Sequence, residues 1–227
     1  MKTLLSLITI TLSCLLIISA SPDKSKPRVL IFSKTNGYHH SSISVGITAI
    51  KKLGDEHGFD VDATDDSTWF NKKTLKKYKA LIFLSSTGKV FGPDEEKALQ
   101  EYIHNGGGYV GIHAAADCEY NWAWYGELLG AYFKSHPKQQ QAKLMVVNKN
   151  HPSTSFLPDT WERFDEWYNF KTISPNTTVL IKIDETSYTG GENGDNHPMT
   201  WYHEFEGGRA FYTEMGIPRH LTPIAFI

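Results

Sequence analysis

The chain has 227 residues, of which 40% are hydrophobic and 21% are charged. This length and composition predict one domain with a sizeable core. The net charge is −2, so nothing in the composition points to nucleic acid as a partner.

The first 20 residues have the pattern of a secretory signal peptide. Lys2 provides a positive start, residues 4–18 form an apolar run, and a small-residue cleavage signal ends at Ala20. The run is too short for a convincing transmembrane span. We therefore expect cleavage after Ala20, a polar linker over 21–27 and a domain over 28–227. The mature protein is then exported, periplasmic or extracellular, with no stable membrane span.

Removal of the signal peptide leaves Cys118 as the remaining cysteine of the chain. One cysteine cannot form an internal disulfide, so the core must supply the stability of the fold. A small buried residue is the favoured interpretation of this thiol, and a nucleophile is the alternative.

Strands and helices are expected to alternate in the first half of the chain. Apolar runs predict the strands, and apolar residues spaced by three and four predict the helices. The expected elements are strands at 28–33, 59–64, 80–85 and 109–112, a helix from 43 to about 54–58, a helix at 93–105, and a partly helical connector at 69–78. Because the strands are apolar throughout, they predict a parallel sheet with helices on both faces.

The second half is richer in aromatic residues and predicts additional strands. They are expected at 143–147, 179–183, 198–204 and 209–215, the last two forming a hairpin around Gly207 and Gly208. The predicted fold class is therefore α/β, with a mostly parallel open sheet, helices on both faces and a late antiparallel hairpin at one side.

A sharp turn after one strand presents a histidine. Three glycines at 106–108 stop a helix, a short apolar strand follows, and His113 stands at its carboxyl end before three alanines. In open parallel sheets, ligands bind beyond the carboxyl ends of the strands. His39 and His40 follow the first strand, so we expect them to share a crevice with His113.

Seven stretches of the chain carry a resemblance to a known family. They are Tyr-His-His-Ser-Ser-Ile (38–43), Gly-Gly-Gly-Tyr-Val-Gly-Ile-His-Ala-Ala-Ala-Asp (106–117), Trp-Tyr-Gly (124–126), Phe-Lys-Ser-His-Pro (133–137), Asp-Glu-Trp-Tyr-Asn-Phe (165–170), His-Pro-Met-Thr-Trp (197–201) and Gly-Gly-Arg-Ala-Phe-Tyr-Thr (207–213). With these stretches in this order, the chain resembles the ThuA-like (trehalose utilisation) family. The resemblance implies a class I glutamine amidotransferase-like, flavodoxin-like fold. It also implies a link to carbohydrate metabolism, including that of oxidised (3-keto) sugars.

Two departures from the family pattern matter for function. True glutaminases of this fold hold a nucleophilic cysteine at the turn where this chain has His113, and Cys118 lies too far along to replace it. Glutamine hydrolysis is therefore not expected. From Met215 onward the chain also leaves the family's usual continuation, which puts a C-terminal contribution to the site in question.

The first functional hypothesis is an enzyme that acts on a sugar or keto-sugar derivative, as a hydrolase, lyase or isomerase. His113 would serve as base and Glu166 as acid, with Asp117 beside them. Aromatic neighbours are expected to bury Glu166 and raise its pKa. The residues predicted to bind the substrate are His39, Trp124, Tyr125, Trp167, Tyr168 and Arg209.

Two further hypotheses stay open. His40 and His113, with a carboxylate, form a ligand set suited to zinc or a similar divalent ion, in a metal-dependent hydrolase. The aromatic content also allows a non-catalytic carbohydrate-binding module. His136, which precedes Pro137, is interpreted as a turn residue. The expected partner is a small carbohydrate, and the oligomeric state is left open.

Overall fold

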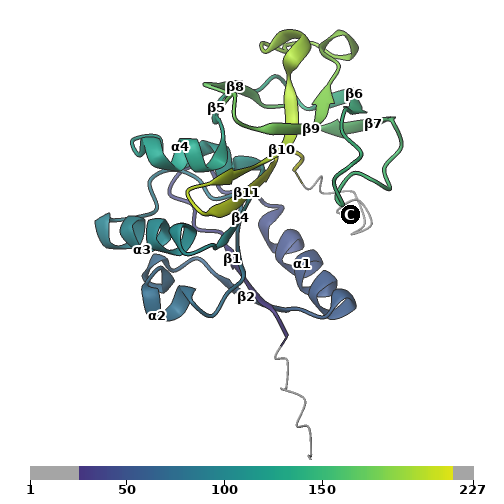
Figure 1. The fold of residues 1–227 in the computed structure, drawn as a ribbon. Coiled ribbons are helices and arrows are strands. Elements are labelled where there is room, and N and C mark those ends of the chain that lie inside the picture. The colour runs from purple at the N-terminus through teal and green to yellow at the C-terminus, as the bar shows by residue number, and fades with distance from the viewer. Residues whose placement is uncertain (1–25, 217–227) are drawn as a thin grey trace, which may run out of the picture.

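Figure 1 shows a computed structural model of the chain, which describes residues 26–216. The predicted signal peptide and most of the C-terminal departure from the family pattern lie outside the described residues. Within residues 26–216, no helix has both the length and the apolarity that a membrane span requires.

A nine-stranded sheet organises the described part of the chain, in the order β2-β1-β3-β4-β11-β10-β9-β6-β7. Its first five strands run parallel to one another. These are β1 (Arg28–Phe32), β2 (Asp60–Thr64), β3 (Ala80–Leu84), β4 (Gly108–Ile112) and β11 (Gly208–Thr213). Leu30, Ile31 and Phe32 are fully buried, as expected for a strand covered on both faces. The carboxyl ends of all five strands therefore meet at one edge.

Helices cover both faces of the parallel part, as the sequence predicted. The helix α1 (Ile43–His57) lies on one face, whereas α2 (Lys72–Leu75), α3 (Pro93–His104) and α4 (Ala123–Leu129) lie on the other (Figure 1). Ile43 and Ile50 are buried on the sheet side of α1, and the helix ends at Gly58 with a left-handed φ of 76°.

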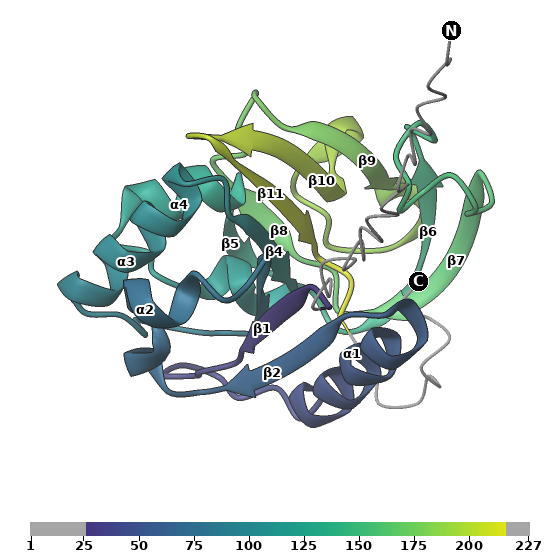
Figure 2. The same cartoon turned by 60° about the horizontal axis from the view of Figure 1, so that its bottom comes forward.

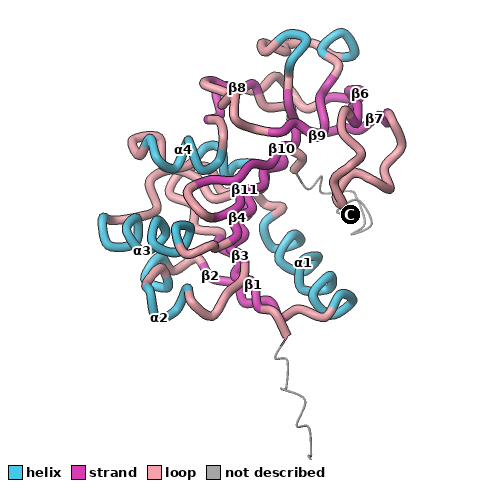
Figure 3. The backbone as a smooth tube through the Cα atoms, viewed as in Figure 1, coloured by secondary structure: helices cyan, strands magenta, loops and turns pink. Residues whose placement is uncertain are grey.

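The remaining strands of the large sheet continue it beyond β11 (Figure 3), and each is antiparallel to its neighbours. They are β10 (Pro198–Phe205), β9 (Thr178–Ile183), β6 (Gln140–Val146) and β7 (Thr160–Asp165). The predicted hairpin is β10 and β11, and its turn is formed by Glu206 and Gly207. Because β11 also pairs in parallel with β4, the hairpin joins the two halves of the sheet.

Three strands were not predicted from the sequence. In β7, inward and outward side chains alternate, so the strand contains charged residues and no apolar run. The strands β5 (Tyr132–Ser135) and β8 (Asn169–Lys171) are short and pair only with each other, beside the large sheet (Figure 2). Short 3₁₀ turns complete the described elements: η1 (Ser67–Trp69), η2 (His113–Asp117), η3 (Glu185–Ser187) and η4 (Gly194–Asn196).

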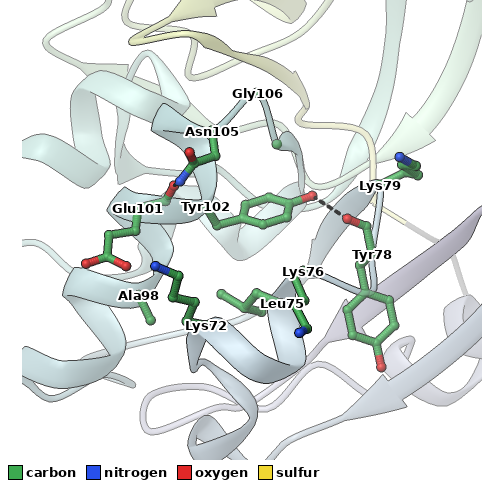
Figure 4. A pocket seen from close by; sticks show the side chains of 11 residues that line it. Lys72, Leu75, Lys76, Tyr78, Lys79, Ala98, Glu101, Tyr102, Asn105 and Gly106 are labelled. Carbon is green, nitrogen blue, oxygen red and sulfur yellow. Dashed lines mark hydrogen bonds between the residues drawn. The ribbon is translucent and has the colours of Figure 1, made fainter.

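A hollow of about 390 Å³ opens between α2 and α3. Figure 4 shows Tyr102 at its centre, with its hydroxyl 3.4 Å from the backbone oxygen of Tyr78. Tyr78 precedes β3 and Gly107, also in the wall, precedes β4. The hollow therefore lies at the amino ends of the strands, at the edge opposite to His113, and is not the predicted site.

Candidate functional site

His113 occupies a sharp turn between β4 and η2. Its φ is 51°, in the left-handed region that non-glycine residues rarely adopt. The hydroxyl of Tyr212 donates a hydrogen bond to the backbone oxygen of His113 at 2.8 Å. His113 Nδ1 lies 2.8 Å from the backbone oxygen of Glu214. Since a carbonyl only accepts, Nδ1 carries a proton and Nε2 is left to face the site.

Glu166 lies at the centre of a cluster of imidazoles. Its Oε2 is 3.4 Å from His113 Nε2 and 3.9 Å from His40 Nε2. The other oxygen, Oε1, is 3.6 Å from His136 Nδ1. Histidines from three separate loops therefore surround one carboxylate, at the edge where the parallel strands end.

The backbone of Glu166 is held by the preceding residues of β7. Its N–H donates to Asp165 Oδ1 at 3.0 Å, and Arg163 Nε donates to Asp165 Oδ2 at 2.8 Å. Arg163 also donates to the backbone oxygen of Gly216 at 2.6 Å. Arg163 and Asp165 are both nearly buried, so this pair fixes the end of β7 and the position of Glu166.

Aromatic rings pack around the imidazoles. Tyr168 lies against His113, with ring centroids 4.3 Å apart, and the ring of His40 meets that of His113 edge-on at 4.9 Å. Side-chain exposure rises from 5% at His113, through 17% at Glu166, to 40% at His136. The cluster is therefore closed beneath His113 and open on the side of His136.

The pKa values of Glu166 and Glu214 are shifted in opposite directions. Burial by itself raises the pKa of Glu166, but the close imidazoles of His113 and His40 and the charge of His136 outweigh it and hold this pKa well below its usual range. The sequence-based prediction of a raised pKa at Glu166 is therefore wrong. Glu214 is fully buried, and burial, with the nearby charge of Asp165, raises its pKa well above the usual range.

The structure brings together four of the predicted site residues: His40, His113, Glu166 and Tyr168. Asp117 ends η2, and its carboxylate accepts a hydrogen bond from Tyr120 at 2.6 Å; a catalytic role for it stays a prediction. His39 is exposed, and its Nδ1 lies 3.0 Å from Thr35 Oγ1. A role for His39 in binding substrate stays a prediction.

Four of the residues predicted to bind substrate do not join this cluster, and a binding role for them stays a prediction. Tyr125 and Trp167 are fully buried, where they donate to the backbone oxygens of Ala115 and Gln140. Trp124 donates to Glu206 at the turn of the β10–β11 hairpin. Arg209 is the second residue of β11 and pairs with Gly108, so it lies at the amino end of β4. Aromatic content alone does not distinguish core packing from a binding surface.

Two site residues were missed. His136 follows β5 and was interpreted as a turn residue. Its Nδ1 does lie 2.9 Å from the backbone oxygen of Pro137, but the same atom also lies 3.6 Å from Glu166 Oε1. Glu214 directly follows β11. Since β11 is parallel to β4, the rule that located His113 at a carboxyl strand end would also have located Glu214.

Cys118 has the properties of a core residue. It is fully buried, and its Sγ lies 3.2 Å from the backbone oxygen of Gly88. Burial raises the pKa of this thiol well above its usual range, so it is a poor nucleophile.

Comparisons with known proteins agree with this fold. The family model ThuA, described as trehalose utilisation, matches residues 28–220. The structure of a ThuA-like protein from Bacteroides uniformis is 27% identical with a TM-score of 0.70, and the match covers 87% of this chain and 85% of that one.

Two other solved structures are more distant in sequence. A ThuA-like protein from Parabacteroides merdae is 21% identical with a TM-score of 0.67, over 83% of this chain and 79% of that one. A cytoplasmic protein from Salmonella typhimurium is 14% identical with a TM-score of 0.61, over 85% and 89%. These two share the fold. No curated protein sequence matches the chain significantly.

Proposed function

The chain belongs to the ThuA family of trehalose utilisation, and on that premise we propose that it is an enzyme acting on a keto-sugar derivative. The cluster around Glu166 is the proposed reaction centre. We further propose that the protein works outside the cytoplasm, a proposal that rests on the signal-peptide pattern of its first 20 residues.

One observation carries the proposal. Glu166 keeps its negative charge although it is largely enclosed, because the imidazoles of His113 and His40 and the charge of His136 offset the cost of its burial. Such a concentration of titratable groups at the carboxyl edge of a parallel sheet is typical of functional sites. Glu166 takes the role of base because it is ionised and lies among the imidazoles. Its lowered pKa makes it a weak base, so the step depends on stabilisation of the enolate by His113.

The proposed step is the removal of a proton from the carbon next to a keto group. The proton passes to Glu166, and the electron pair of the broken C–H bond moves to the carbonyl oxygen, giving an enolate. His113 protonated on Nε2 would donate a hydrogen bond to that oxygen, because its Nδ1 is already bonded to the Glu214 backbone. Cysteine chemistry has no part in this step.

Solvent deuterium exchange tests the step without requiring a complete reaction. Protein expressed without a histidine tag is incubated with 3-keto-trehalose in D₂O, and proton NMR follows the signals next to the keto group. We expect loss of these signals faster than in buffer alone. Glu166→Gln should reduce the exchange by about 100-fold or more, since general-base catalysis contributes on that order. His57→Gln, an exposed change at the far end of α1, should leave it unchanged.

The same experiment separates catalysis from binding alone. If calorimetry detects binding of 3-keto-trehalose but deuterium exchange does not exceed the buffer rate, the protein is a carbohydrate-binding module and not an enzyme. Equal exchange in wild type and Glu166→Gln would remove Glu166 from the mechanism.

A further inference from the structure

We infer that His40, His113 and Glu166 bind one divalent transition-metal ion, with zinc as its simplest occupant. One nitrogen of each imidazole and one carboxylate oxygen lie within 4.8 Å of one another. Two imidazoles and a carboxylate form a ligand set that suits zinc and related ions. The inference adds a cofactor to the same site and, in the metal-bound form, moves the role of base away from Glu166. It rests on the proposed function only through the residues that they share.

The distances between the ligand atoms fit one ion with a small adjustment. Atoms about 2.1 Å from a tetrahedral zinc are roughly 3.4 Å apart. The separation of His113 Nε2 and Glu166 Oε2 is 3.4 Å, and that of His40 Nε2 from the same oxygen is 3.9 Å. His40 must therefore approach Glu166 by about half an ångström, and it must also close on His113, because the three ligand atoms are bounded only by 4.8 Å. Its buried Nδ1 has no hydrogen-bond partner among residues 26–216, so no bond at that atom resists the shift.

Contacts outside the ligand set already orient two of the ligands. Histidines that bind metals usually donate the other ring N–H to a carboxylate or backbone oxygen, which fixes the tautomer. His113 has this arrangement, with Nδ1 2.8 Å from the backbone oxygen of Glu214. Glu166 is positioned by the bond from its N–H to Asp165, which Arg163 holds in turn. Neither arrangement needs to form when the ion binds.

Three protein ligands leave at least one coordination position for substrate or water, as in catalytic zinc sites. An ion there would polarise the keto oxygen of a bound sugar. With Glu166 bound to the ion, proton transfer falls to His136. It lies 3.6 Å from Glu166 Oε1 and is the exposed member of the cluster. The metal-free and metal-bound forms thus assign the base to different residues.

Zinc binding by protein without a histidine tag tests the inference. The protein is stripped with a chelator, dialysed and titrated with zinc chloride by calorimetry, and cobalt absorption reports the coordination geometry. We expect one site per chain. His40→Gln and Glu166→Gln should each weaken binding by about 100-fold or more, since even changes outside the ligand set cost 10- to 100-fold. His57→Gln, an exposed change at the far end of α1, is the control that should retain the wild-type affinity.

Absence of zinc and cobalt binding by folded wild-type protein would overturn the inference. Equal affinity in wild type, His40→Gln and Glu166→Gln would also overturn it, since the ion would then lie elsewhere. Circular dichroism shows whether each variant folds. Because two ligand variants are tested, the experiment remains decisive if one of them fails to fold. The zinc titration involves no reaction, so it is independent of the exchange experiment. Deuterium exchange by protein that binds no metal would disprove the metal site and support the proposed function. Zinc binding without deuterium exchange in the zinc-loaded protein would support the metal site and disprove the proposed function.

Discussion

Glu214 shows how one buried carboxyl supports the site without facing it. Its Oε1 accepts the backbone N–H of Tyr168 at 3.1 Å, and its backbone oxygen orients the ring of His113. Its Oε2 has no hydrogen-bond partner in the described part of the chain. A charged carboxylate would be costly there, and burial accordingly raises the pKa of Glu214 well above its ordinary value of 4.5.

Glu214→Gln is predicted to gain stability relative to wild type as the pH rises. A carboxyl whose pKa is raised by folding contributes stability that is complete below its unfolded pKa, near 4.5, and is lost as the pH rises through the folded pKa. Glutamine does not titrate and escapes this loss. The difference in the free energy of unfolding should therefore shift in favour of the variant by about 1.4 kcal/mol per pH unit within that window.

Urea unfolding of both proteins from about pH 5 to about pH 8 measures this difference. Any constant offset from the amide cancels, since only the slope is compared. Glu204→Gln removes an exposed carboxyl near the turn end of β10, and should show a flat difference over the same range. A flat difference for Glu214→Gln would mean that Glu214 is ionised in the folded protein.

The two glutamates also mark the limit of sequence reasoning at single residues. The aromatic neighbours of Glu166 predicted its partial burial correctly. The direction of its pKa shift, however, is set by His40 and His113, which are distant in sequence. Glu214 has no comparable signal, because its neighbours in the chain do not reveal that it is fully buried. The direction of a pKa shift depends on spatial neighbours that a local pattern does not contain.

At the scale of elements, two glycines end helices in the same conformation but in different surroundings. Gly58 ends α1 with a φ of 76°, and Gly130 ends α4 with a φ of 99°. A Cβ at Gly58 would meet nothing within 4 Å. At Gly130 it would lie 2.6 Å from Trp201 Nε1 and 2.8 Å from Thr177 Cγ2. The pair therefore separates the backbone cost of a side chain from its steric cost.

Gly58→Ala is predicted to destabilise the fold by about 1 kcal/mol, the ordinary cost of a non-glycine residue in the left-handed region. Gly130→Ala should cost roughly 2 kcal/mol more, because Trp201 is fully buried and its N–H bond to the Leu129 backbone oxygen must be disturbed. Chemical denaturation of the two variants measures both costs. Equal destabilisation would show that the indole yields to the added methyl group without penalty.

The elements that the sequence predicted are those with a local signal. The strands β1, β3 and β4 contain apolar runs, α1 has apolar residues spaced by three and four, and a glycine ends α1 where expected. The strand β7 contains no apolar run, and β8 has only three residues, so neither has a pattern to find. Pairing has no local signal either. The hairpin was correctly expected at one side of the sheet, but the parallel pairing of β11 with β4 that attaches it there was not predicted.

At the scale of the whole molecule, the site exists only in the folded chain. His40 follows β1, His113 follows β4, His136 follows β5 and Glu166 follows β7. The rule for parallel sheets predicted the meeting of the first two, because both follow parallel strands. It could not place His136 or Glu166, since β5 lies outside the large sheet and β7 is its antiparallel edge strand.

This assembly predicts that the proposed ion will stabilise the native state as a whole. An unfolded chain does not hold these ligands together, so the ion binds the folded form preferentially, and at 100 times its dissociation constant it adds about 2.7 kcal/mol. In a chain of this size, that corresponds to a rise in Tm of about 5–11 °C. Differential scanning calorimetry with and without zinc measures it. His57→Gln should show the full rise and His40→Gln little of it, whereas an equal rise in both would indicate that zinc stabilises the protein from another place.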